Sequence, residues 1–494
     1  MKETMGRKKV IAVYMAIFWG LLGFLWLLLV CAAAIPNETL KGHMEESALS
    51  YKEKEAFSFE RGKKWNGISD NYADTILLNV SWNMGKGNPL LSSLDTWYYS
   101  GEGFGENAGL YLTVTEDMEP DTDYTRYWHG SAVVVRLFHL IMDVKGIKRM
   151  GFLAAMGLAA VTVAMLFARK HYDIGMGFLL SMGAVQIWNI GLSLEYEPAF
   201  VICFLLCPLY LWTERMGDGY ITCLSLAGGV LIAFFDFLTT ETVVLLVPLI
   251  LVIAVRTKEK RLGDGKKSFC MLFLCGICWG FAYMGTFLVK WAAASLVTGE
   301  NKFLLALSSA GERVNGALPG EHADGLARIP MAVAANLTMM FYGEARVEPL
   351  RAAAGMAVSF LILGSVLYLF HKKKGNGIGI RMLLLLGSVV LLRYMVLSNH
   401  SYLHEFFTYR ALMSPVLAVF LSLALSTELP AFGRRKRSRK RGRTDGGKAD
   451  GGKAGRGKAD RGKADRGKAD RGKADRGKAD REKTDRGKTG DGRM

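Results

Sequence analysis

The sequence predicts an all-α polytopic membrane protein with about ten transmembrane helices, a large first extracytoplasmic loop and a disordered C-terminal tail. Three observations predict this class. Several windows of about 17 to 25 residues lack internal charge, the length needed to cross a hydrocarbon core of about 30 Å. Basic residues gather in most of the alternate connections between those windows. The end of the chain repeats a charged motif without apolar residues.

Residues 1–35 are expected to form the first transmembrane helix. Basic side chains from Lys2 to Lys9 precede an apolar run from Val10 to Ala34. That run is too long for the apolar region of a signal peptide, and no small-residue cleavage pattern precedes a soluble domain. We therefore expect an uncleaved span with its N-terminus in the cytoplasm.

The segment 36–149 is the only long polar stretch before the tail, and we expect it to form the extracytoplasmic loop. Apolar spacing in Asp74–Trp82 predicts a short amphipathic helix, and Tyr124–Asp143 predicts a second one that leads into the membrane. Both would lie along the membrane interface. The part from Gly85 to Gly109 is rich in Gly, Asn and Ser and is expected to be irregular.

The segment 150–430 is expected to form the polytopic transmembrane domain. Four of the five connections assigned to the cytoplasm are clearly basic, among them Arg169–His171, Arg256–Lys267 and His371–Lys374. This bias predicts a multi-pass protein of the cell membrane with both termini cytoplasmic. The nine further spans are expected at about 150–168, 174–190, 198–213, 220–236, 241–256, 268–291, 351–370, 380–397 and 411–428.

The same alternation places four polar connections on the extracytoplasmic side, together with the large loop. They are 193–198, 236–241, 292–350 and 399–410. Ordinary connections would distribute acids, histidines and aromatic residues over both faces. Their convergence indicates a functional site at the outer membrane boundary.

The tail 431–494 carries +15 of the formal charge of +17, because Lys and Arg outnumber Asp and Glu there by 15. The body of the chain is therefore close to neutral, and we expect no specific nucleic-acid partner. The tail repeats Arg-Gly-Lys-Ala-Asp and should be disordered. The cluster Arg434–Arg443 is suited to anionic lipid headgroups, and the simpler interpretation is a stop-transfer anchor followed by a solvated tail.

Charges within the apolar spans bear on the kind of function. Asp236, Lys290 and Arg393 each lie near the expected outer end of a span. An ion-coupled transporter would be expected to place polar groups near the middle of the membrane. The observed placement favours a substrate with a lipid tail in the bilayer and a polar head at its surface.

A lipid-phosphate substrate requires cations, which a short connection near the C-terminus offers. Arg393, His400, His404 and Arg410 are the candidates, and Arg is the residue best suited to bidentate contact with phosphate. The simpler interpretation of nearby Trp and Tyr residues is the aromatic belt of the membrane interface.

An acceptor hydroxyl requires a carboxylate base, for which the large loop offers Asp70, Asp74, Asp121 and Asp123. Acids in a solvated loop are usually only surface groups. Asp121-Thr-Asp123 is similar to the D-x-D motif of nucleotide-sugar enzymes, but such matches are frequent and Pro120 marks a turn. We therefore expect no metal ion and no cofactor.

The layout resembles the GT-C class of polyprenyl-phosphate-dependent membrane glycosyltransferases: one span, a large outer loop with acids, then many spans with short functional loops. Four motifs are similar to those of a largely uncharacterised group of GT-C-like membrane proteins of Gram-positive bacteria. They are Asp70–Asp74, Arg126–Gly130, Phe235–Thr240 and Asn399–Arg410. The resemblance covers about residues 1–428 and excludes the tail.

The resemblance implies transfer of a sugar from a polyprenyl-phosphate donor to a cell-envelope acceptor at the extracytoplasmic face. Asp74 is the first candidate for the base. Asp70 is an alternative, and so is Glu46, because the GT-C acid usually follows the first span closely. The implied substrate-binding residues are Arg126, His129, Arg393, His400, His404 and Arg410.

Two other functions stay open at this stage. The chain could be a flippase or transporter of lipid-linked glycans, or a non-enzymatic envelope protein whose outer loop binds a partner. A polar cavity that crosses the whole helical bundle would favour transport. A cavity that is closed toward the cytoplasm and open to the outer loop would favour transfer.

Overall fold

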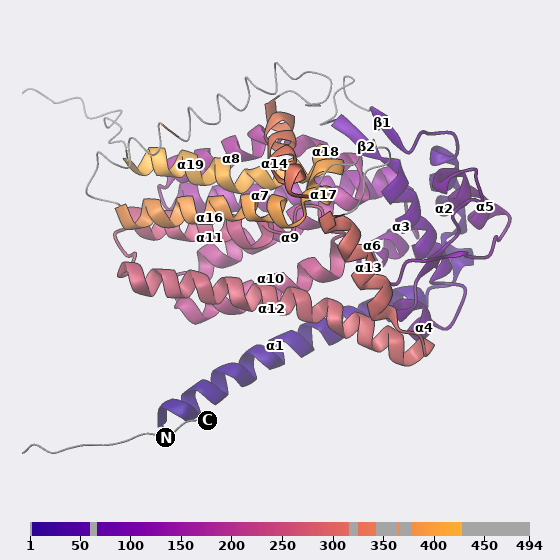
Figure 1. Ribbon diagram of the computed structural model, residues 1–494, viewed down its shortest axis with the longest axis horizontal. Helices are drawn as coiled ribbons and strands as arrows, with labels where there is room; N and C mark the ends of the chain where they lie inside the picture. Colours follow the sequence, from indigo (N-terminus) through magenta and orange to yellow (C-terminus); the bar gives the residue numbers. More distant parts are fainter. Residues whose placement is uncertain (1, 60–66, 316–324, 342–363, 365–376, 427–494) are drawn as a thin grey trace, which may run out of the picture. The chain divides into compact units, whose positions relative to one another are not determined.

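A computed structural model describes residues 2–59, 67–315, 325–341, 364 and 377–426 (Figure 1). The chain divides into two units, Met1–Phe432 and Gly433–Met494, and all described residues belong to the first. Apart from residue 364, the expected span 351–370 lies outside the described residues, and so does the expected disordered tail.

Seven helices of the described part are long and apolar enough to cross a membrane, so we treat the chain as an α-helical membrane protein. The spans of α9 and α19 include the short helical turns that lead directly into them. The seven helices are α1 (Lys2–Ala33), α7 (Val144–Ala168), α9 (Glu197–Thr213), α10 (Asp218–Phe235), α12 (Gly265–Thr298), α16 (Gly377–Val396) and α19 (Met413–Ser426).

Two of the ten expected spans are corrected by the structure. The segment 174–190 forms α8 (Tyr172–Ala184), and 241–256 forms α11 (Val243–Lys258). At 1.5 Å per residue these helices are about 20 and 24 Å long, short of a hydrocarbon core of about 30 Å. α8 stops before Gln186, whose φ of 52° is left-handed. Other helices bury α11 almost completely, and this burial accounts for its apolar sequence.

The segment expected as a loop is instead a folded polar layer, a name we use for residues 36–143. It contains two short antiparallel strand pairs, with Phe57 opposite Asp70 in one and Trp97 opposite Asp123 in the other. The expected helix 74–82 lies within α3, while the stretch expected to be irregular contains α4 and β3. The elements are α2 (Asn37–Tyr51), β1 (Phe57–Phe59), β2 (Ile68–Asp70), α3 (Asn71–Asn83), α4 (Pro89–Leu94), β3 (Trp97–Tyr98), α5 (Glu106–Thr115), β4 (Thr122–Asp123) and α6 (Ser131–Phe138).

Arg136 ties the polar layer to the end of α1. Its buried guanidinium donates from Nε to the Ala32 carbonyl at 2.8 Å and from Nη1 to Asn37 Oδ1 at 3.0 Å and the Ser81 carbonyl at 2.6 Å. A buried guanidinium is stable only when such acceptors surround it. One side chain therefore fixes α1, α2 and α3 against one another.

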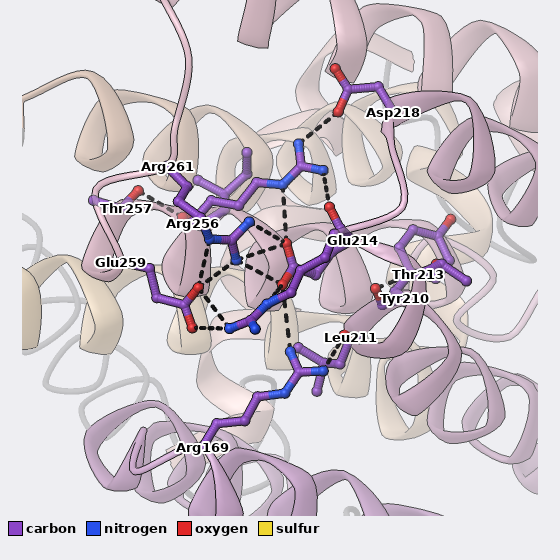
Figure 2. Close-up of polar contacts among 12 residues, drawn as sticks. Arg169, Tyr210, Leu211, Thr213, Glu214, Asp218, Arg256, Thr257, Glu259 and Arg261 are labelled. Carbon is purple, nitrogen blue, oxygen red and sulfur yellow. Dashed lines mark hydrogen bonds and ion pairs between the residues drawn. The ribbon is translucent and has the colours of Figure 1, made fainter.

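An ion-pair network closes one end of the bundle, where α7, α9 and α11 end and α8, α10 and α12 begin. Figure 2 shows Glu214 among the guanidinium groups of Arg169, Arg256 and Arg261, at 3.5, 3.4 and 2.8 Å. Glu259 pairs with His171 at 2.9 Å. Three of the five connections that the sequence assigns to the cytoplasm thus share one end. The side of the membrane stays a prediction.

The opposite end carries the polar layer (Figure 1). The segment between α10 and α11 also lies there, because Leu238 contacts His400 and Arg393. The further elements of this end are η2 (Ile187–Leu192), η3 (Leu194–Tyr196), α13 (Lys302–Asn315), α14 (Gly325–Phe341), α17 (Ser398–Leu403), α18 (Glu405–Thr408) and η4 (Tyr409–Leu412).

Candidate functional site

A pocket of about 350 Å³ lies where the polar layer meets these connections. It combines side chains that are far apart in the sequence, from β1 and α3 at one extreme to α17 and α18 at the other. Its polar lining consists of Asp70, Tyr72, Tyr124, Arg126, Tyr127, His129, Glu195, Arg313, Asn399, His400 and His404. The expected convergence of outer connections is therefore seen as one cavity at one end of the helices.

Asp70 is placed by the start of α3, where it is the N-cap residue. Its Oδ1 accepts from the Ala73 amide at 2.9 Å, and its own amide donates to Ser193 Oγ at 2.7 Å. Burial raises the pKa of Asp70 to about 7, although the Ala73 hydrogen bond opposes the rise. The carboxyl group can therefore take up or release a proton near neutral pH.

Glu195 on η3 faces Asp70 across the pocket wall. The two carboxyl groups interact, and a hydrogen bond between them would require a proton on one of them. Among the described residues, Glu195 Oε1 has no hydrogen-bond partner, although the side chain is buried. Buried polar atoms are normally paired, so this oxygen is available to a ligand in the pocket.

His129 sits in a strained backbone position, with φ at 56°. The next residue, Gly130, packs so closely that a Cβ there would lie 2.3 Å from the Phe234 ring. His129 Nε2 donates to the Tyr124 carbonyl at 2.9 Å, which leaves Nδ1 as an acceptor. Nδ1 has no partner in the described part of the chain. Burial lowers the pKa of His129 to about 3, so the ring is neutral.

His400 and His404 form a ring pair on the same pocket, with centroids 4.7 Å apart. His400 Nε2 is 3.0 Å from the Leu238 carbonyl. Burial lowers the pKa of His404 to about 4 and that of His400 well below its usual range. Both rings are therefore neutral at physiological pH, which corrects the expectation that they supply positive charge.

Two arginines supply the positive charge of the pocket instead. Arg126 lies over the Tyr124 ring at 4.3 Å and donates to Ser309 Oγ at 3.3 Å. Arg313 donates to Tyr127 Oη at 2.6 Å. Arg126 was a candidate from its motif, whereas Arg313 was missed because 292–350 was treated as a simple connection. The helical spacing of polar residues from 302 to 313 is the signal that identifies it.

Asp74, the first candidate for the base, does not line the pocket. Its side chain is completely buried and pairs with Lys148 Nζ at 2.5 Å. It also accepts hydrogen bonds from Tyr51 Oη at 2.8 Å and the Leu194 amide at 2.7 Å. These contacts join α3 to α2, α7 and η3. Asp74 therefore has a structural role.

Three other candidates also lie outside the pocket lining. Arg393 pairs with Glu241 at 2.8 Å and binds the carbonyls of residues 238 and 239, so it fixes the connection before α11. Arg410 is buried, with its guanidinium 4.7 Å from the Tyr196 ring centroid. Glu46 is exposed on α2.

The acids of the D-x-D sequence have protein partners. Asp121 accepts from the Ser100 amide at 2.9 Å, while Asp123 pairs with Lys302 Nζ at 2.8 Å. The same ammonium lies 3.2 Å from Asp95 and so stands where a cation would bridge these carboxylates. Among the described residues, no group of three or more His, Cys, Asp or Glu side chains is arranged to hold a metal ion.

Comparisons with protein-family models, curated proteins and solved structures found no match to this chain.

Proposed function

We propose that the protein is a membrane glycosyltransferase that moves a sugar from a polyprenyl-phosphate donor to a cell-envelope acceptor in this pocket. One observation carries the proposal: a carboxyl group that titrates near neutral pH shares a cavity with two arginines and three neutral histidines. Such a set suits a reaction that moves a proton at one point and releases a phosphate at another.

Asp70 is the proposed general base. Its pKa lies near the operating pH, where general-base catalysis is most effective. Asp70 takes the proton of the acceptor hydroxyl while the hydroxyl oxygen bonds to the anomeric carbon. The bond from that carbon to the phosphate oxygen breaks, and the phosphate leaves with the electron pair.

Arg126 and Arg313 are the proposed partners of that phosphate. Planar guanidinium groups bind phosphate oxygens through paired hydrogen bonds. The neutral rings and the free Glu195 oxygen suit sugar hydroxyls, since His129 Nδ1 and Glu195 Oε1 both accept hydrogen bonds. Tyr72 and Tyr127, which line the pocket, offer aromatic faces to the sugar ring.

The structure of the helical bundle beyond the pocket favours sugar transfer over transport of a lipid-linked glycan. α11 runs through its core, and the residues from Val243 to Val255 are all buried and apolar. The ion-pair network around Glu214 closes the other end (Figure 2). A transporter needs a polar route between the two ends, and this arrangement supports a site that opens at one end only.

The test is turnover of a polyprenyl-phosphate sugar by the full-length protein in liposomes. Asp70→Asn keeps the shape and the α3 cap but removes the proton acceptor, so we expect turnover to fall at least about 100-fold. Glu119→Gln, at an exposed acid of the polar layer, is the matched control and should keep wild-type turnover. Unchanged turnover in Asp70→Asn, Arg126→Ala and Arg313→Ala would reject the proposal.

A further inference from the structure

On the helix α13, two leucines point away from the protein while polar side chains of the same helix are buried. Lys302 and Ser309 are buried, while Leu304 and Leu307 are 65% and 60% exposed. A helix on a water-facing surface shows the opposite arrangement, with its apolar stripe against the protein. The reversal indicates that the outer face of α13 does not meet water.

Three polar contacts fix the inner face of α13 to the polar layer. Lys302 pairs with Asp123 at 2.8 Å, Ser309 accepts from Arg126 at 3.3 Å, and Arg313 donates to Tyr127 at 2.6 Å. The positions 302, 309 and 313 lie on one side of a helix with 3.6 residues per turn. The orientation of α13 is therefore set by its inner contacts, and the exposure of its leucines follows from it.

The outer face of α13 follows the exposed apolar surface of α12. Figure 1 shows α13 running from the end of α12 toward α17. The rings of Trp291 and Phe303 are 5.9 Å apart at this junction. The membrane span α12 exposes Phe281 and Leu288, at 53% and 46%. The same apolar surface thus extends from a transmembrane helix onto α13.

We infer that α13 is an interfacial helix whose outer face, Leu304 and Leu307, lies among the acyl chains of the bilayer. Its inner face closes the pocket and supplies Arg313. The helix then separates the bilayer from the cavity, which places Arg126 and Arg313 next to the membrane boundary. The inference concerns the lipid contact of α13 and does not depend on the reaction.

A photo-cross-linking residue placed on α13 tests this contact directly. p-Benzoylphenylalanine replaces Leu307 in the full-length protein in lipid nanodiscs, and mass spectrometry identifies the adducts. Phe281 on α12 is the lipid-facing control, and Phe104, 77% exposed in the polar layer, is the water-facing control. We expect lipid adducts at position 307 in yields similar to those at 281 and several-fold above those at 104.

Leu304 provides a second labelling position in case the variant at 307 does not fold. Lipid adducts at 304 and 307 support the inference. Adducts at both positions that join only to peptide, from this chain or a second copy, would overturn it, as would yields no higher than at Phe104. The readout involves no catalysis, so inactive protein in these variants leaves the result interpretable.

Discussion

At the scale of single residues, Asp70 and Asp74 show what the sequence could and could not predict. They are four positions apart in one motif, and both were candidates. Asp70 ends a strand and lines the pocket, whereas Asp74, one turn into α3, faces Lys148. Which acid meets the cavity depends on partners more than 70 residues away in the sequence, at Lys148 and Ser193. Spacing within the motif does not contain that information.

The contrast gives a stability prediction for Asp74. Asp74→Asn removes the charge that compensates Lys148, and unpairing a buried ion costs about 3–5 kcal/mol. We expect a clearly lower melting temperature of the purified protein in detergent. Lys148→Met with Asp74→Asn removes both charges and should recover part of the loss. A wild-type melting temperature in Asp74→Asn would argue against the structural role.

At the scale of elements, apolar windows predicted seven helices that are long enough to cross a membrane, and they overestimated the length of two. α8 and α11 are as apolar as those seven helices, because a helix surrounded by other helices needs the same residues as one surrounded by lipid. The order of helices within the polar layer was also largely missed. Its short elements are held by side-chain contacts such as those of Arg136, which hydrophobic periodicity does not show.

Close packing of α10 on α12 depends on Gly229. A Cβ there would lie 2.4 Å from the Trp279 carbonyl oxygen and 2.9 Å from Ala282 Cβ. We expect Gly229→Ala to force the helices apart at a cost of about 1–3 kcal/mol and to lower the melting temperature. Gly157 on α7 has no neighbour within 4 Å, so Gly157→Ala is the control and should be neutral or stabilising. Equal melting temperatures in both variants would contradict this packing.

At the scale of the whole molecule, the chain separates its chemistry between two ends. One end holds a network of arginines and glutamates, and the other holds the pocket, where neutral histidines lie beside two arginines and two carboxyl groups. Charge alternation along the sequence predicted which connections share an end. This is possible because the positive-inside rule links the side on which a connection lies to its content of Lys and Arg, whatever the packing of the helices. The chemical character of each end could be assigned only from the side-chain contacts in the structure.

The sidedness of the two ends is a separate prediction. We expect a cysteine at Phe104 in the polar layer to react with an impermeant maleimide added outside intact cells. A cysteine at Lys260, beside the arginine network, should react only after the cells are opened. The native cysteines set the background, which the unmodified protein measures. Labelling of position 260 alone in intact cells would reverse the topology.

The pH dependence of turnover tests the central claim, that Asp70 acts as the base, most directly. A base works in its ionised form, and the pKa of Asp70 is raised to about 7, so the ionised fraction grows as the pH rises through that value. We predict that wild-type turnover in liposomes increases with pH through about 7 and then levels off. In Asp70→Asn, turnover should be lower by at least about 100-fold and should lack this rise. A variant that retains both the rate and the pH profile of the wild type would contradict the account.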